Sequence, residues 1–225
     1  MDIELLSSIP LFSELSDEEL ESISKQTVRQ IFKKDNMVLI EEEIGSTMFV
    51  ILDGRVKISR ISDEGREVIL SILCDGDFFG EMSILDGQTR SANAVTLEDT
   101  QMLIMRRENF LQILYDYPQV SINLLKELAH RLRRSDSQIK SLSLQNALGR
   151  VASTILRIAD DSGTIRHGKV EISNLPPQQD LANMAGTSRE TISRVIKSLN
   201  QLGYVKKEGS KLIILEYERF RQDFS

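Results

Sequence analysis

Cysteine and histidine are scarce in this chain of 225 residues, which contains one cysteine and two histidines. Cys74 has no second cysteine with which to form a disulfide, and a four-cysteine iron–sulfur cluster cannot be built. Together with His130 and His167 it supplies too few ligands for an ordinary zinc site. We therefore expect no disulfide framework and no bound metal, and we expect Cys74 to be a small buried hydrophobic residue.

Long hydrophobic runs are also missing. No apolar run approaches the 18 residues that suggest a membrane-spanning helix, and the first residues, MDIELLSS, are acidic where a secretory signal would be basic. No pairing of a nucleophile with a base stands out either. We therefore expect a cytoplasmic protein that does not contact a membrane and is not an enzyme.

Charge is distributed unevenly along the chain, whose net charge is −6. Residues 1–145 contain 16 Lys and Arg against 25 Asp and Glu, a net charge of −9, whereas residues 146–225 contain 12 against 9, a net charge of +3. A chain of this length can form two modest domains, each with its own core. The charge difference suggests that only the second domain meets a polyanion.

The stretch from Val120 to Gln145 has the apolar spacing of a dimeric coiled coil. Apolar residues recur at intervals of three and four, interrupted once by Ser135, at Leu125, Leu128, Leu132, Ile139 and Leu142. A helix with such a stripe favours an identical partner over a monomeric core, so we expect a homodimer. The hydroxyl of Ser135, followed by Asp136, stands where leucine would pack better. The Ser135 hydroxyl either sets the register of the two helices or takes part in binding a ligand.

The segment before this helix predicts a β-rich domain. A short helix is expected from the Ser16 to Glu19 capping pattern to about Lys25. Runs of β-forming residues then follow, with turn residues between them about every ten residues. The runs cover residues 37–40, 48–52, 56–61, 68–73, 92–95 and 102–105. This pattern is typical of an antiparallel roll or barrel.

One segment of the expected roll departs from a simple hairpin. After Phe79, Gly80 allows close backbone approach and Glu81 follows at once, and Arg90 and Ser91 come nine and ten residues after Glu81. Arg90, Ser91 and backbone N–H groups could hold an anion while Glu81 accepts from a sugar hydroxyl. The alternative, from spacing alone, is a surface turn with a Glu81–Arg90 ion pair.

The residues after the expected dimer helix predict a second domain. Gly149 marks the expected hinge into a second domain, because glycine costs roughly 1 kcal/mol in a helix interior. A helix over 151–158, a polar loop over 160–168 and a strand over 169–172 are expected next. Residues 203–215 predict a hairpin with Lys206, Lys207 and Lys211, and 217–224 a short closing helix.

Residues 177–199 have the organisation of a helix-turn-helix. Pro177 suits the first helical position, Ala182 is small where a second helix must cross, and Gly186 supplies the turn. Thr187 and Glu190 form a capping box that opens the second helix. That helix is expected to bury Ile192, Val195, Ile196 and Leu199.

The opposite face of the second helix is expected to enter the major groove of DNA. It carries Arg189, Glu190, Ser193, Arg194 and Lys197. Arginine can bind guanine O6 and N7, and glutamate can accept from cytosine N4. Candidates for phosphate contacts are Gln178, Gln179, Thr187, Ser188 and Lys197. If this helix is considered without the rest of the chain, the alternative is that its exposed face is only solvated and contacts no DNA.

Three motifs, which follow one another along the chain as the Phe79–Ala92 segment, the expected dimer helix and the helix-turn-helix, resemble the bacterial CRP/FNR family of transcription regulators over nearly the whole chain. The run from Phe79 to Ala92 is similar to the phosphate-binding cassette of cyclic nucleotide-binding domains, and the run from Thr187 to Arg194 is similar to the family's recognition helix. The resemblance implies an α+β fold in three parts. These are an N-terminal antiparallel β-roll that binds cyclic nucleotide (1–117), a dimerisation helix with its hinge (118–146), and a C-terminal winged helix-turn-helix (147–225).

The resemblance also implies roles for individual residues of the cassette. Glu81 would bind the ribose 2′-hydroxyl, and Arg90 with Ser91 would bind the cyclic phosphate. Gly80 and Met82 would line the cap of the pocket. In the second domain, the resemblance implies a TGTGA-like half-site read by Arg189, Glu190 and Arg194.

Two residues of the dimer helix complete the implied pocket. Ser135 would meet the purine of its own subunit, and Asp136 would reach into the pocket of the other subunit. Asp136 departs from the cyclic-AMP receptor, which has a hydroxyl residue at this position. A carboxylate can accept from the adenine amino group but pairs better with the two neighbouring donors of guanine. Cyclic AMP is the expected ligand and cyclic GMP the second candidate. Alternatively, Asp136 pairs with Arg133 and Arg134 and the pocket is empty.

The expected function is therefore that of a homodimeric regulator controlled allosterically by a cyclic nucleotide. Its expected partners are double-stranded DNA, the nucleotide, a second copy of the chain and RNA polymerase. Oxygen-sensing family members use an N-terminal cysteine cluster and haem-based members need cysteine and histidine near the cassette, so neither cofactor is expected. Two alternatives stay open. One is a ligand-independent regulator controlled by its abundance, and the other is a nucleotide-binding regulatory subunit that acts on a protein partner.

Overall fold

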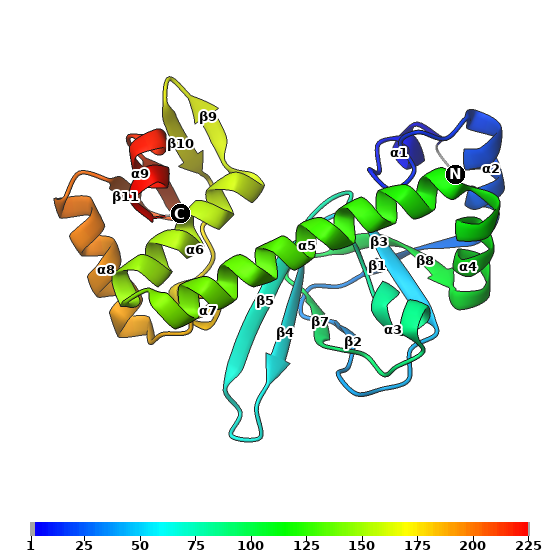
Figure 1. The fold of residues 1–225 in the computed structure, drawn as a ribbon, viewed down its shortest axis with the longest axis horizontal. Helices are drawn as coiled ribbons and strands as arrows, with labels where there is room; N and C mark the ends of the chain where they lie inside the picture. Colours follow the sequence, from blue (N-terminus) through cyan, green and yellow to red (C-terminus); the bar gives the residue numbers. More distant parts are fainter. Residues whose placement is uncertain (1–2, 225) are drawn as a thin grey trace. The chain divides into compact units, whose positions relative to one another are not determined.

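The computed structural model describes residues 3–224 and divides into two compact units, with the boundary along the chain between Leu132 and Arg133. The long helix α5 (Pro118–Leu144) contributes residues to both units (Figure 1). Within the described residues, no helix is both long enough and apolar enough to cross a membrane.

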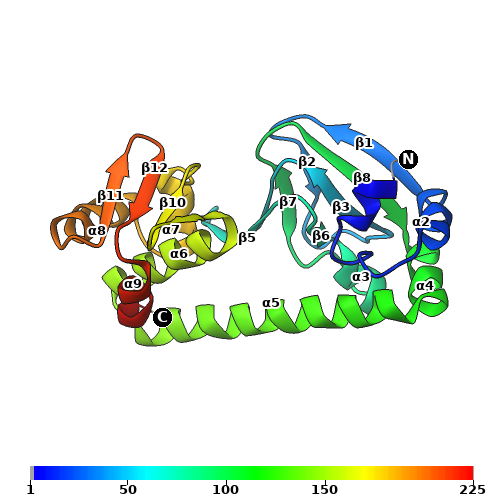
Figure 2. The ribbon, with the colours of Figure 1, turned by 90° about the horizontal axis from the view of Figure 1, so that it is seen from above.

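Two antiparallel four-stranded sheets form the body of the first unit (Figure 2). One has the strand order β1-β8-β3-β6 and the other β2-β7-β4-β5. The strands are β1 (Thr27–Phe32), β2 (Met37–Leu39), β3 (Thr47–Asp53), β4 (Val56–Ile61), β5 (Glu67–Leu73), β6 (Phe78–Phe79), β7 (Asn93–Thr96) and β8 (Thr100–Arg106). The predicted antiparallel roll is confirmed.

Strand β3 is central because both of its faces are buried. Phe49 and Ile51 belong to a cluster with residues of both sheets, whereas Met48, Val50 and Leu52 pack with residues of the helices. Successive side chains of a strand point to opposite faces, so this position requires an unbroken apolar run. Strand β1 lies at the edge of its sheet with its middle residues exposed, and for that reason it lacks such a run and was not predicted.

Four shorter helices accompany these sheets, namely α1 (Ile3–Ser7), α2 (Asp17–Ser24), α3 (Glu81–Asp86) and α4 (Arg107–Asp116). Helix α2 begins at the predicted capping box, in which the Glu19 carboxylate accepts from the Ser16 N–H at 2.8 Å. Helices α1, α3 and α4 are absent from the sequence-based prediction. Phe110 of α4 packs in the same core as Val120 and Leu124 of α5, and this packing fixes the start of the long helix.

Cys74 lies in the turn that follows β5. Its backbone N–H donates to the Asp77 carboxylate at 2.8 Å, and the residue is partly exposed. The expectation of a buried cysteine is wrong, because the buried part of the strand ends at Leu73.

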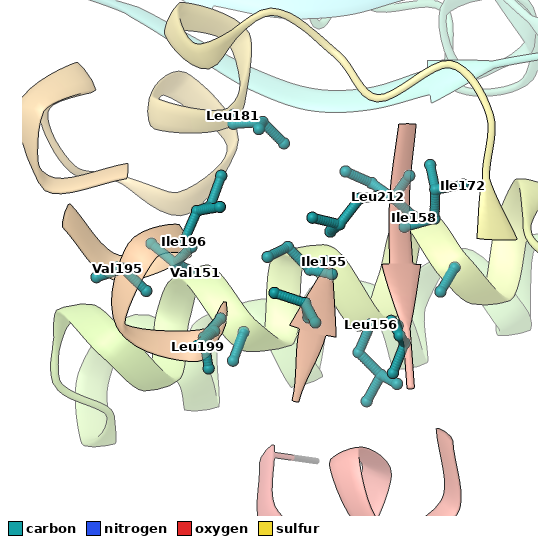
Figure 3. Packing of buried hydrophobic residues seen from close by; sticks show 14 of the residues in the cluster. Val151, Ile155, Leu156, Ile158, Ile172, Leu181, Val195, Ile196, Leu199 and Leu212 are labelled. Carbon is teal, nitrogen blue, oxygen red and sulfur yellow. The ribbon is translucent and has the colours of Figure 1, made fainter. Parts of the chain in front are cut away.

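The second unit combines four helices with a sheet of the order β11-β12-β10-β9. Its elements are α6 (Ala147–Ser162), β9 (Thr164–Arg166), β10 (Lys169–Ile172), α7 (Gln178–Ala185), α8 (Arg189–Gln201), β11 (Val205–Glu208), β12 (Lys211–Ile214) and α9 (Tyr217–Phe224). Figure 3 shows how side chains of α6, α7, α8, β10 and β12 meet in one apolar cluster. The predicted hairpin and closing helix are confirmed, whereas β9 occupies part of the segment predicted as a polar loop.

The break between α5 and α6 falls at Gln145 and Asn146, so the expected hinge at Gly149 is wrong. The Asn146 side chain caps α6 by accepting from the Gly149 N–H at 3.0 Å. Asparagine is a strong N-cap, and it starts the helix before the glycine. Gly149 instead serves close packing, because a Cβ there would lie 3.1 Å from the Gln145 Cβ.

Replacing Phe220 by alanine is expected to lower the unfolding free energy of the second unit by about 3–5 kcal/mol, because removal of a fully buried ring leaves a cavity. The ring comes from α9 and packs against Tyr204 and Phe224. Urea denaturation measures the change. The control, Tyr115→Ala, removes a ring that is 84% exposed, and it should change stability by less than about 0.5 kcal/mol. Equal losses in the two variants would contradict the observed packing.

Candidate functional site

The predicted cassette folds as strand β6, a left-handed residue and helix α3. Gly80 has φ of 82° and precedes Glu81, the first residue of α3. The side chains of Glu81 and Arg90 lie in the interior, with only 3% and 5% of each residue exposed. The alternative of a surface turn is therefore wrong, because both charged groups are held below the surface.

The Arg90 guanidinium is fixed by the backbone around it. It donates to the carbonyl oxygens of Thr47 (2.6 Å) and Gly80 (2.7 Å) and to the Ser83 Oγ (2.8 Å). Burial lowers the pKa of Arg90, and the nearby Glu81 carboxylate opposes that effect. A methyl group at Gly45 would overlap the guanidinium, so the loop before β3 needs glycine there. Neither Thr47 nor Gly45 was among the predicted site residues.

Glu81 faces a second arginine that the sequence prediction missed. Arg131 of α5 lies 3.3 Å from the Glu81 carboxylate, donates to the Phe78 carbonyl at 2.8 Å and stacks over the Phe78 ring at 4.4 Å. It also pairs with Glu127 at 3.0 Å. Burial raises the pKa of Glu81, and Arg131 and Arg90 oppose the rise. The sequence offered one clue to Arg131: it lies one helical turn before Ser135, which was itself predicted to line the pocket.

The remaining cassette residues lie next to this buried pair. The exposed Ser91 hydroxyl is 3.5 Å from the sulfur of Met82, which is itself half exposed. The fold thus brings the five predicted cassette residues together in one segment: Gly80, Glu81, Met82, Arg90 and Ser91. A fixed guanidinium, a hydroxyl and a buried carboxylate are suited to a ligand with both an anionic and a hydroxyl group.

The apolar stripe of α5 is mostly exposed in the single chain. Leu125, Leu132, Ile139 and Leu142 are 55–65% exposed, whereas Leu128 packs against the core of the first unit. A row of four large exposed apolar residues on one helix is unusual for a monomeric surface.

Ser135 and Asp136 both lie on α5, within the second unit. The described ion pair of Arg134 is with Asp161 of α6, at 2.6 Å. For Arg134, the expected alternative of a surface pair with Asp136 is therefore wrong.

Helices α7 and α8 form the predicted helix-turn-helix. Gly186 ends α7 with φ of 58°, as its place in the turn requires. The four predicted apolar residues of α8 are buried, namely Ile192, Val195, Ile196 and Leu199. The five residues predicted for the opposite face are exposed, namely Arg189, Glu190, Ser193, Arg194 and Lys197.

The capping of α8 differs from the prediction. Ser188 is the N-cap, and its hydroxyl accepts from the Thr191 N–H at 3.2 Å. The expected Thr187–Glu190 capping box is wrong, because the helix begins one residue later than that box requires. Backbone and Ser188 hydrogen bonds hold the pKa of Glu190 below its usual value. Its exposed carboxylate is therefore ionised at neutral pH.

The other predicted DNA-contact residues have mixed environments. Gln179 is exposed and donates to Asn183 at 3.0 Å, and Gln178 and Thr187 are partly buried. In the hairpin, Lys206 pairs with Glu208 at 2.6 Å and Lys211 with Glu171 at 2.8 Å. The carboxylates partly neutralise these two lysines. The exposed face of α8 is therefore better placed than the hairpin to contact DNA.

Comparison with known proteins decides the family. Residues 29–117 match a family model described as "Cyclic nucleotide-binding domain", and residues 149–222 match one described as "Crp-like helix-turn-helix domain". The chain is 31% identical over 216 residues to the "CRP-like cAMP-activated global transcriptional regulator" of Mycobacterium tuberculosis, and the match covers 96% of each chain. The chain belongs to the CRP/FNR family of transcription regulators.

Two further proteins are similar to this chain over most of its length. The "Cyclic AMP receptor protein" of Thermus thermophilus is 35% identical over 197 residues, which is 88% of each chain. A CooA variant from Carboxydothermus hydrogenoformans is 23% identical, has a TM-score of 0.79 and covers 98% of this chain and 95% of its own, which supports the fold alone. The CRP/FNR family is one of DNA-binding transcription regulators and not of enzymes.

Proposed function

We propose that this regulator is a homodimer that binds cyclic AMP with its first unit and a palindromic, TGTGA-like operator with its second. The observation that carries the proposal is the buried Glu81 next to the carbonyl-anchored Arg90. These groups match the hydroxyl and the anion of a cyclic nucleotide. The nucleotide changes operator affinity through its differential affinity for the arrangements of the chain.

The proposed ligand contacts follow from these groups. Arg90 and Ser91 bind the cyclic phosphate, and Glu81 accepts from the ribose 2′-hydroxyl. Gly80 and Met82 cover the ligand. The proximity of Arg131 to Glu81 supports a place for Arg131 beside the same carboxylate. In addition, Ser135 contacts the purine within its own subunit, and Asp136 contacts the purine of the partner subunit.

Calorimetric titration of the purified protein with cyclic AMP and with cyclic GMP tests the ligand. Relatives whose names refer to cyclic AMP support this nucleotide, although the carboxylate of Asp136 is better suited to guanine. We expect cyclic AMP to bind more tightly. Tighter binding of cyclic GMP would overturn the choice of nucleotide, and the absence of heat with both would overturn the pocket.

Nucleotide binding is expected to weaken as the pH falls through the raised pKa of Glu81. The raised pKa means that Glu81 takes up a proton at a higher pH than an ordinary glutamate, and protonation removes the better acceptor for the ribose hydroxyl. Dissociation constants measured over a pH series test this. Glu81→Gln should bind weakly at every pH. A pH dependence that persists unchanged in this variant would rule Glu81 out as its source.

Double-stranded operator DNA is the proposed partner of the second unit. The exposed face of α8 supports contacts of Arg189, Glu190 and Arg194 with base edges. The phosphate contacts are assigned to Gln178, Gln179, Thr187, Ser188 and Lys197, and Ser193 lies on the same exposed face. We further propose that the protein acts in the cytoplasm and contacts RNA polymerase.

The exposed stripe of α5 supports the homodimer. Two such helices can bury Leu132 and Ile139 against their counterparts. A dimer also places two identical reading helices on the two halves of a palindrome.

Leu132→Asp combined with Ile139→Asp is expected to convert the protein to a monomer, because four carboxylates would face one another in the dimer seam. Sedimentation velocity should then show the mass of one chain, and operator affinity should fall because only one half-site is bound. Leu144→Asp is the matched control. This residue is 78% exposed and two positions beyond the last stripe residue, on the face opposite to the stripe. Dissociation in the control alone would place the dimer contact elsewhere.

A further inference from the structure

The two residues that join α5 to α6 are held from both helices. The side-chain oxygen of Gln145 accepts from Ser141 of α5 at 2.6 Å and from Ser153 of α6 at 2.9 Å. Asn146 caps α6, as described above. The junction therefore has a defined geometry and is not a free linker.

Arg150, in the first turn of α6, connects this junction to the helix-turn-helix. Its Nη1 donates to the carbonyl of Gln145 at 3.2 Å, and its Nε donates to the carbonyl of Ala185 at 3.1 Å. Its Nη2 lies 3.4 Å from the carbonyl oxygen of Gly186. One guanidinium thus links two segments of the second unit that are far apart in the sequence.

Two of the carbonyls that Arg150 contacts lie at the end of α7 and in the turn that leads to α8. Ala185 is the last residue of α7, and the final carbonyls of a helix have no partner within the helix and carry partial negative charge. Gly186 is the turn residue, and α8 begins only three residues later, at Arg189. A Cβ on Gly186 would lie 3.0 Å from the Leu142 side chain, so the end of α5 also reaches this turn.

We propose that Arg150 is a positioning residue that transmits the arrangement of the α5–α6 junction to the recognition helix α8. None of the three carbonyls that it binds belongs to the nucleotide site or to the reading face of α8. Arg150 therefore affects operator binding only through the turn. The inference rests on the proposed function, because it requires that operator affinity depends on the nucleotide.

The geometry requires arginine in particular. The planar guanidinium presents several N–H donors in a fixed fork, which suits carbonyls in different directions. A lysine at this position keeps the positive charge, but its single nitrogen cannot reproduce the fork. Arg150→Lys is therefore expected to behave like Arg150→Ala. A role that depended on charge alone would be restored by lysine.

The experiment compares the full-length wild type, Arg150→Ala, Arg150→Lys and the control Arg166→Ala. Arg166 is an exposed arginine of β9 in the same unit, so its loss changes the net charge equally. Three quantities are measured: cyclic AMP affinity without DNA, the ratio of operator affinities with and without saturating cyclic AMP, and amide hydrogen exchange at Gly186 and Thr187.

For both Arg150 variants we expect the operator ratio to fall at least fivefold, which is about the lower end of typical allosteric coupling. Exchange at Gly186 and Thr187 should become faster, and cyclic AMP affinity should stay within about threefold of wild type. Arg166→Ala should match wild type throughout. A wild-type ratio retained in Arg150→Ala, or fully restored in Arg150→Lys, overturns this inference alone. A ratio of one in the wild type overturns the proposed function and the inference together.

Discussion

Replacing Arg90 by leucine is expected to weaken cyclic nucleotide binding by about a hundredfold or more and to abolish the response of operator binding to the nucleotide. A hydrogen bond from a charged donor contributes roughly 1.5–3 kcal/mol, and the upper end of this range corresponds to about a hundredfold change in affinity. Isothermal titration of the variant with cyclic AMP measures the loss directly.

The fold should survive this replacement, although with reduced stability. Arg90 also donates to the carbonyls of Thr47 and Gly80, and leucine leaves these buried acceptors without that donor. The cost of such unsatisfied groups is roughly 1–3 kcal/mol each. Circular dichroism and thermal unfolding therefore accompany the titration, and Arg90→Lys serves as a second variant that keeps the charge. Nucleotide affinity equal to wild type in a folded Arg90→Leu protein would refute the pocket assignment.

Replacing Glu190 by alanine is expected to relax base preference more than it weakens total DNA binding. The exposed, ionised carboxylate can accept from cytosine N4, and one good contact with a base edge contributes roughly 1–3 kcal/mol of discrimination. The corresponding loss of selectivity at one base pair of each half-site is about 5- to 150-fold. Binding to a library of operators substituted at single positions measures it.

Two controls separate base reading from helix capping. Ser188, and not Glu190, provides the N-cap hydrogen bond of α8, so Ser188→Ala should lower stability without changing which base is preferred. Glu218→Ala removes a carboxylate from α9, outside the helix-turn-helix, and should leave the selectivity unchanged. A uniform loss of affinity across all operator sequences in Glu190→Ala would mean that Glu190 does not read a base.

The parts of the fold that depend on local pattern were predictable from the sequence. The alternation of short apolar runs with turn residues gave most strands of the roll, because buried strands need apolar residues on at least one face. The 3.6-residue periodicity gave the buried face of α8 together with its exposed face. Edge strand β1 and the short strand β9 were missed, since exposed strands carry no such pattern, and the buried two-residue strand β6 was missed because it is too short to show one.

Only the site residues that lie within one short segment of the sequence were predictable. Gly80, Glu81, Arg90 and Ser91 lie within twelve residues of one another, and their spacing is visible in the sequence. Arg131 reaches Glu81 from a helix fifty residues later, and Gly45 makes room for Arg90 from the loop before β3. Long-range contacts of this kind depend on the packing of the sheets and helices, which no local pattern encodes.

The starts of α6 and α8 were placed incorrectly because each has a competing boundary residue nearby. Asn146 and Ser188 are the N-caps, whereas Gly149 lies three residues after Asn146 and Thr187 lies next to Ser188. Serine and threonine have similar capping preferences, so sequence alone does not choose between neighbours. The observed hydrogen bonds of the caps decide it.

The most direct test of nucleotide control is the affinity of the purified protein for a selected palindromic operator, measured with and without saturating cyclic AMP at fixed salt. We expect a dimer whose operator affinity rises on addition of the nucleotide by about 5- to 150-fold, the usual range of allosteric coupling. Equal affinity in the two conditions, with the nucleotide shown to be absent from the purified protein, would contradict nucleotide control and favour a regulator controlled by its abundance.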